Sequence, residues 1–329
     1  MGNLGRRTLQ WMPLVLGLAL VVAVVIVAVH RSEVEEFSDL LHRAAPGWLL
    51  AAALLQLGTY MLQAEALRVF LRTSRVQHLR IELLKLSIAR LFIDQVLPSA
   101  SVGGAAFMAN GLQQLGIAPS KAMAAVVSDT VAYYIGYSLC LIAAIALMLA
   151  GGHVSVPILI ASTIVVVLTA LLVLEMHRIA HRKARRFLRA VDRLPGIGAT
   201  ARALARADSN LLNDRRRLVQ ATAWECGVHL LDAMTMGVLL LAVGVSTPPW
   251  AVFSSFMLAS LARTVGIVPG GLGTFEAVSV ASLRAAGVSL AAALAATLLF
   301  RGFSFWLPMI PGWWLTRDEA RGGRKKKRS

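Results

Sequence analysis

The 329-residue sequence has few charges, few aromatic residues and only two cysteines. Charged residues make up 15% of the chain and hydrophobic residues 57%, and the mean hydropathy is +0.68. This composition lies outside the range of soluble domains. The cysteines, Cys140 and Cys226, have no partner at the spacing of a metal or redox motif, so we expect both to pack inside apolar helices.

Motifs of nucleotide binding and catalysis are also absent. The glycine-rich turn at Gly270–Gly273 lacks the Lys-Ser/Thr step of a phosphate-binding P-loop. No Ser-His-Asp or paired-thiol constellation stands out, and the alternation of period two that would indicate strands is missing. We therefore expect no cofactor, no metal ion and no catalytic residue.

Long uncharged runs dominate the sequence instead. Four of them have 21 to 23 residues each: Thr8–Val29, Ala44–Ala64, Thr130–Gly152 and Val154–Leu174. A bilayer core is crossed by ~20 helical residues. The chain is therefore predicted to be an all-α polytopic membrane protein.

The positive charge is concentrated in two segments. The net charge is +16; residues 176–217 carry 12 Lys and Arg against 3 Asp, and the tail 317–329 carries 7 against 2 acidic residues. Cytoplasmic flanks collect positive charge, and anionic headgroups attract it. We predict a bacterial-type plasma membrane protein with both termini, the 176–217 loop and the polybasic tail in the cytoplasm. The tail has no interleaved aromatic residues, so no nucleic-acid partner is expected; protein partners are unknown.

Hydropathy and charge together place six full transmembrane helices. They are Met12–Val29, Pro46–Phe70, Lys121–Leu149, Val156–Leu174, Leu218–Val243 and Ser289–Leu315. The first run resembles a signal peptide, but it is too long for an h-region and no small-residue cleavage site follows, so we expect a retained helix. Trp306, in the middle of the last helix, is predicted to face the bundle.

Two further segments, Leu83–Leu115 and Trp250–Ala286, do not fit as single spans. The first is broken by Pro98 and Gly103-Gly104, and the second by Pro269-Gly-Gly-Leu-Gly273. Each arm has only ~13–18 residues, fewer than the ~20 that a span needs. We predict two re-entrant helical hairpins, which enter from opposite faces and bring the total to eight hydrophobic segments.

The two broken segments share a spacing. Pro98 and Pro269 are each followed 18 residues later by a glycine, Gly116 or Gly287, and then by a long apolar helix. The regions about 83–150 and 250–316 are therefore predicted to be halves of an inverted repeat inside one domain, residues 1–316. The alternative is that two Pro/Gly breaks coincide by chance.

Charges, proline and glycine at membrane depth are costly, which makes them candidates for function. The predicted substrate-binding residues are Arg263, Pro269, Gly270, Gly271, Gly273, Glu276 and Arg301 in the second copy, and Arg90, Asp94 and Asp129 in the first. Arginine binds phosphate bidentately, and helix N-termini add N–H donors. The carboxylates would hold the arginines when no ligand is bound. The alternative is a set of permanent ion pairs that only hold the bundle together.

A third group of polar residues lies in one predicted helix. Glu225, His229 and Asp232 stand at i, i+4 and i+7, so they share one helical face. A histidine between two carboxylates can relay protons. Structural hydrogen bonding is the alternative, and three ligands on one helix make a poor metal site.

The second-copy string resembles a known family. Pro269-Gly-Gly-Leu-Gly-Thr-Phe-Glu276, with Arg263 before it and Arg301 after it, resembles the lysylphosphatidylglycerol synthase transmembrane (flippase-like) family. The pattern of Arg90, Pro98, Gly103, Gly116 and Asp129 resembles the first half of that family. The first copy departs from it at Ser99-Ala-Ser101-Val, where Arg or Gly-Glu often stands. The resemblance spans roughly Leu14 to Leu315.

The resemblance implies a lipid as the substrate. Bifunctional members carry a soluble aminoacyl-transfer domain after the membrane region, whereas this sequence ends a few residues past its last predicted helix. We therefore expect translocation of an anionic phospholipid or lipid-linked phosphate through a midplane site between the hairpins, without lysyl transfer. Anionic membrane lipids are the expected partners. The alternative is a non-transporting membrane enzyme or accessory factor that acts on a lipid carrier.

Overall fold

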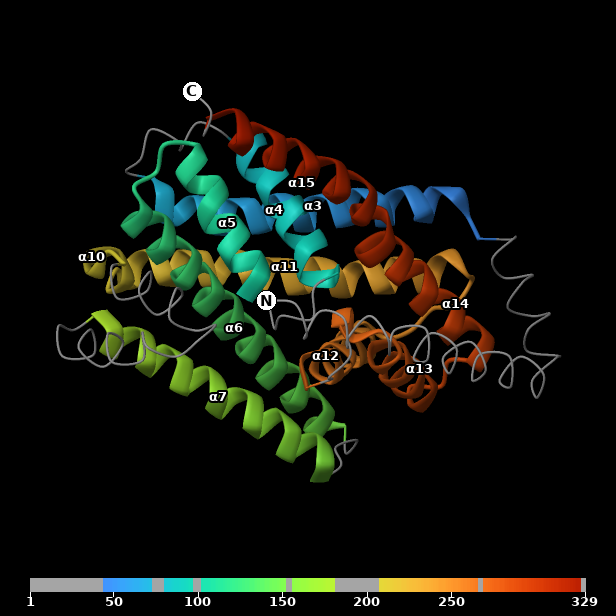
Figure 1. Ribbon diagram of the computed structural model, residues 1–329. Helices are drawn as coiled ribbons and strands as arrows, with labels where there is room; N and C mark the ends of the chain where they lie inside the picture. The colour runs from blue at the N-terminus through green and yellow to red at the C-terminus, as the bar shows by residue number, and fades with distance from the viewer. Residues whose placement is uncertain are drawn as a thin grey trace, which may run out of the picture.

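The computed structural model describes residues 44–72, 80–96, 102–151, 156–180, 207–265 and 269–326 (Figure 1). Within these ranges the chain is all-helical, with 89% of residues in helices and no strands. The predicted all-α class is confirmed. The predicted first helix, Pro98 and most of the basic 176–217 loop lie outside the described residues.

The helices follow the order in which the sequence predicts them. The bounds are α3 Pro46–Leu71, α4 Arg80–Val96, α5 Val102–Gln114, α6 Pro119–Ala150, α7 Val156–Ala180, α10 Ser209–Leu212, α11 Arg215–Ala242, α12 Pro249–Val265, a 3₁₀ turn Pro269–Gly271, α13 Thr274–Ala285, α14 Leu290–Arg301, a π-helical turn Gly302–Trp306 and α15 Leu307–Lys326. Both broken segments form two short helices each, α4 with α5 and α12 with α13.

Three helical stretches in the described part are long and apolar enough to cross a membrane: α6, α11 and the continuous Leu290–Thr316. The 32 residues of α6 extend ~48 Å, which exceeds the ~30 Å of a bilayer core. Large aliphatic side chains are exposed along α7, such as Ile160, Ile164 and Leu168. Apolar surface of this kind suits contact with lipid tails, and the chain is a membrane protein.

The bundle is built around α11. This helix lies lengthwise beside α3, and α6, α12 and α14 also pack against it (Figure 1). The start of α3 is tied to the end of α11, because the Ala45 N–H donates to the Ala242 carbonyl at 3.1 Å. The tip of the second hairpin, the Pro269–Gly271 turn, packs against α4 of the first. The two broken segments therefore meet inside the bundle.

The two segments that the sequence predicts to be repeat copies share a local structure at their second arms. Gly116 ends the turn after α5 with φ 88°, and Gly287 ends the turn after α13 with φ 89°. In each copy the next N–H reaches back across the turn, from Ile117 to the Leu112 carbonyl and from Val288 to the Leu283 carbonyl, both at 3.1 Å. This is a glycine C-cap of the Schellman type. The following helix, α6 or α14, begins three residues after the glycine in both copies.

The last span changes from α- to π-helical geometry directly after Arg301. In a π-turn each N–H bonds the carbonyl five residues back, and Leu307 bonds Gly302 in this way. The next residue, Pro308, has no N–H, so it cannot donate a hydrogen bond to the Phe303 carbonyl. The Tyr60 hydroxyl of α3 donates to that carbonyl instead, at 3.0 Å.

The π-turn also explains one wrong prediction. Trp306 was expected to face the bundle, but it is 57% exposed, whereas Phe305 is 3% exposed. The wider turn shifts the helical register, so that the residue before Trp306 takes the inward position.

Tyr60→Phe is expected to destabilise the protein by about 1–3 kcal/mol, because the buried Phe303 carbonyl loses its donor. The measurement is the free energy of unfolding in mixed micelles. Tyr134→Phe is the matched control, since the Tyr134 hydroxyl forms no hydrogen bond with the described residues. Equal stability of the two variants would contradict this account of the π-turn.

Candidate functional site

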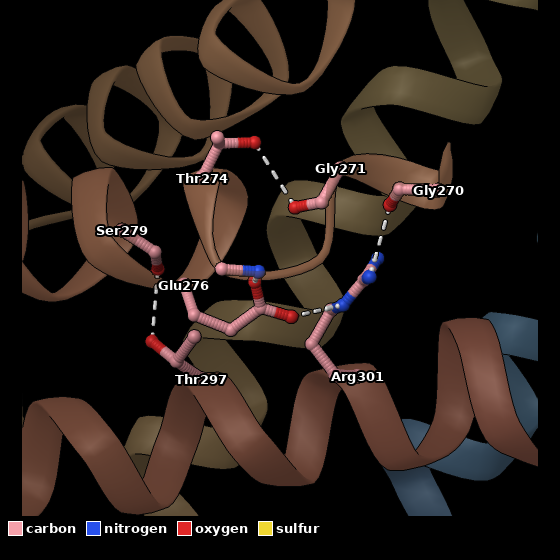
Figure 2. A network of polar contacts seen from close by, with 8 residues as sticks. Gly270, Gly271, Thr274, Glu276, Ser279, Thr297 and Arg301 are labelled. Carbon is pink, nitrogen blue, oxygen red and sulfur yellow. Dashed lines mark hydrogen bonds and ion pairs between the residues drawn. The ribbon is translucent and has the colours of Figure 1, made fainter. Parts of the chain in front are cut away.

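The second copy brings Arg301, Glu276 and the glycine turn together, as the sequence predicts (Figure 2). Arg301 Nε donates to Glu276 Oε1 at 2.6 Å, and its Nη2 donates to the Gly270 carbonyl at 3.0 Å. The other carboxylate oxygen of Glu276 accepts the Gly273 N–H at 2.7 Å, at the N-terminus of α13. One arginine on α14 is thus bonded to both the tip and the second arm of the hairpin.

Aromatic rings enclose the Arg301 guanidinium. It lies 4.3 Å from the ring centre of Phe305 and 5.4 Å from that of Phe275, both within the range of cation–π attraction. Phe275 in turn stacks on Phe300, and the Ser279 and Thr297 hydroxyls join α13 to α14 at 2.9 Å (Figure 2). The Arg301 side chain is only 4% exposed. Its position is held by contacts on several sides.

The backbone conformation of the hairpin tip, residues Pro269–Gly271, requires glycine. Gly270 and Gly271 have φ values of 65° and 64°, in the left-handed region that a side chain disfavours. A Cβ at Gly271 would also overlap the side chain of Arg263. The tip therefore depends on residues without side chains, and Arg263 packs against its backbone. Of the predicted set, the Pro269 side chain lies outside the described part.

Arg263, at the end of α12, has a different environment from Arg301. Its Nη2 lies 3.5 Å from the Tyr133 hydroxyl of α6, the single hydrogen bond that it forms with described residues. No carboxylate among those residues lies within 4.0 Å of its guanidinium. Asp232 and the tyrosines of α6 act on it electrostatically. Arg263 therefore has a charge that no close ion pair in the described part neutralises.

In the first copy, Arg90, Asp94 and Asp129 also come together. Arg90 Nη1 lies 2.8 Å from Asp129 Oδ2, and its Nε lies 3.6 Å from Asp94 Oδ2. The start of α5 lies against Asp94, because a Cβ at Gly104 would overlap the Asp94 carboxyl group. In the second broken segment Glu276 likewise lies at the start of the second arm, where it accepts the Gly273 N–H. In both segments a carboxylate therefore lies at the start of the second arm and pairs with an arginine.

The α11 residues face the same interior. Glu225 and His229 are 3% and 2% exposed, and Glu225 Oε2 and His229 Nε2 have no hydrogen-bond partner among the described residues. Asp232 accepts a weak hydrogen bond from Gln56 Nε2 at 3.4 Å. The alternative role of these three residues was structural hydrogen bonding. It accounts for Asp232 but not for Glu225 and His229. No three His, Cys, Asp or Glu side chains of the described ranges cluster as a metal site requires.

Two tyrosines in the interior were missed from the sequence. Tyr133 and Tyr137 of α6 both lie close to His229, with ring centres 5.3 and 5.5 Å from it. Their i, i+4 spacing, one turn after Asp129, was the available signal. The two cysteines are free thiols, buried at Cys140 of α6 and half-buried at Cys226 of α11, and the Cys226 thiol donates to the Gly136 carbonyl at 3.7 Å.

These features define a class of protein: a polytopic helical membrane protein with arginines and carboxylates inside the bundle. The chain matches the family described as the lysylphosphatidylglycerol synthase TM region over residues 14–312, and it belongs to that family. It is therefore a membrane protein of lipid metabolism or transport. Among curated proteins, none matches the chain.

Proposed function

We propose that the protein translocates an anionic phospholipid or a lipid-linked phosphate across the membrane, through a midplane site between its two broken segments. In this proposal α4–α5 and α12–α13 are re-entrant hairpins that enter from opposite faces, and six full helices surround them. The protein resides in a bacterial-type plasma membrane with both termini in the cytoplasm. The site binds and moves the lipid without making or breaking a bond in it.

The observation that carries the proposal is that no carboxylate of the described residues lies close to the Arg263 guanidinium. A cation inside an apolar bundle is costly unless an anion accompanies it. Arg263 has no such partner within 4.0 Å among the described residues, and it stands beside the backbone of a glycine turn. A phosphate group would supply the missing charge and accept two parallel hydrogen bonds from the guanidinium. Arg301 differs, because Glu276 already neutralises it.

Two further observations support the arrangement. The arms α4, α5, α12 and α13 have 17, 13, 17 and 12 residues, all shorter than a span. The two copies also end in the same glycine C-cap and lead into the next helix at the same offset. Paired broken helices of matched design are typical of transporters that bind their substrate near the midplane.

The test is translocation of headgroup-labelled lipids in proteoliposomes that contain the purified protein. We expect labelled phosphatidylglycerol to move between leaflets faster than in protein-free liposomes, and labelled phosphatidylcholine to move at the protein-free rate. Labelled polyprenyl phosphate is the second anionic probe. Equal rates with and without protein for both anionic lipids would overturn the proposal and would favour the accessory-factor alternative.

A further inference from the structure

The helices α6 and α11 pack against each other, and each carries a buried carboxyl group. Glu225 of α11 is 3% exposed and Asp129 of α6 is 6% exposed. One oxygen of each, Glu225 Oε2 and Asp129 Oδ1, is buried without a hydrogen-bond partner among the described residues. Gly136 lets the two helices approach closely here, because a Cβ at that position would touch the Cβ of Glu225 at 3.0 Å.

The charges around this pair do not balance. The groups that act on Glu225 are Asp129 of α6, Arg90 of α4 and Asp232 on α11 itself. From α12, Arg263 acts on His229 and Asp232, and α3 contributes the neutral Gln56 near Asp232. Arg90 already pairs with both Asp129 and Asp94. Asp129 and Asp94 therefore share one guanidinium, and no cation lies within 4.0 Å of Glu225 among the described residues, so these neighbouring buried carboxyl groups cannot all remain charged.

We infer that Glu225 and Asp129, together with Arg90, form a proton-binding site that is coupled to anion binding at Arg263. One proton from bulk water adds to a carboxylate oxygen of the pair and is released from it again. Asp129 retains its bond to Arg90, and Glu225, which has no cation within 4.0 Å in the described part of the chain, carries the proton. The inference deepens the proposed function, because it rests on Arg263 being the anion site.

The same two helices connect the proton site to Arg263. Tyr133, which Arg263 contacts, lies one turn after Asp129 on α6. On α11, Asp232 acts on Arg263 and lies seven residues after Glu225, which is ~10 Å along the axis. A unit charge at ~10 Å in an effective dielectric of ~20 changes a binding equilibrium roughly tenfold. Neutralising Glu225 therefore favours the anion, and by linkage the bound anion favours the proton.

The first measurement concerns the proton alone. In the purified protein without added lipid, infrared difference spectra across a pH titration should show a carboxyl carbonyl band that Glu225→Gln removes. Glu82→Gln is the matched control, since Glu82 is a surface residue paired with Lys85, and it should retain the band. A titration in which no band depends on Glu225 or Asp129 would overturn the proton site.

A stability comparison separates the proton site from a permanent ionic contact. Glu225→Gln imitates the protonated state, so the protein should be at least as stable as the wild type. Asp129→Asn removes the closer of the two carboxylate partners of Arg90 and should lower the unfolding temperature. If Glu225→Gln were as destabilising as Asp129→Asn, then Glu225 would be an ionised structural partner and the inference would be wrong.

The second measurement concerns the coupling. Short-chain phosphatidylglycerol should bind the wild type roughly tenfold more tightly at the low-pH end of the titration than at the high-pH end, and Glu225→Gln should abolish this dependence. If the carboxyl band is present but no lipid binds, the proton site stands and the proposed function is wrong. If the lipid binds with the same affinity at every pH, the coupling is wrong and the proposed function stands.

Discussion

Arg263→Ala is expected to slow the translocation of labelled phosphatidylglycerol roughly 10- to 100-fold. Arg263 has no carboxylate within 4.0 Å among the described residues, so its charge is available to a headgroup phosphate. A hydrogen bond to a charged group contributes about 1.5–3 kcal/mol, and each 1.4 kcal/mol is tenfold in an equilibrium. The measurement is the initial rate in proteoliposomes with the same protein density.

The same variant should fold normally. The main loss in the described part is one long hydrogen bond to Tyr133, so the unfolding temperature should change little. Arg263→Lys is expected to retain part of the activity, because lysine keeps the charge but not the bidentate geometry. Arg284→Ala, at an exposed position on α13, is the control for losing a positive charge. An Arg263→Ala protein as active as the Arg284→Ala protein would remove Arg263 from the site.

Within the described residues, hydropathy was sufficient to predict where the long helices lie. The predicted Pro46–Phe70 corresponds to α3 at Pro46–Leu71, and Lys121–Leu149 corresponds to α6 at Pro119–Ala150. These boundaries are local: proline starts both helices, and runs of apolar residues continue them. The break between α12 and α13 was predicted from a similarly local signal, and it falls at Pro269–Gly271. In the first segment the prediction was partly wrong, because Gly103 and Gly104 lie inside α5 and do not interrupt it.

The partners inside the site required the structure. Charge alone suggested that Glu276 could hold Arg301, but the bond from Arg301 to the Gly270 carbonyl depends on how the hairpin tip packs against α14. Tyr60 and Phe303 are 243 residues apart, and their bond exists because Pro308 leaves a carbonyl free in a π-turn. The inward turn of Phe305 follows from the same π-turn. No periodic pattern in the sequence signals a change of helical register.

Arg301→Ala is expected to destabilise the protein by about 3–5 kcal/mol. The change removes both bonds that fix the hairpin, leaving Glu276 Oε1 and the Gly270 carbonyl without a donor. Breaking a buried ion pair from one side costs this much, and the Glu276 carboxylate that remains is only 19% exposed. The cation–π contacts with Phe275 and Phe305 are lost as well. The free energy of unfolding in mixed micelles measures the effect, and Arg284→Ala should stay within about 0.5 kcal/mol of the wild type.

A double-mutant cycle identifies the ion pair as the cause. Once Arg301 is absent, the half-buried Glu276 carboxylate has lost its ion-pair partner, so neutralising it with Glu276→Gln should recover part of the lost stability. The glutamine also keeps an acceptor oxygen for the Gly273 N–H. The double variant should therefore be more stable than Arg301→Ala alone. Additive losses would instead mean that the two side chains act independently, and that Arg301 stabilises the hairpin only through the Gly270 carbonyl and its aromatic neighbours.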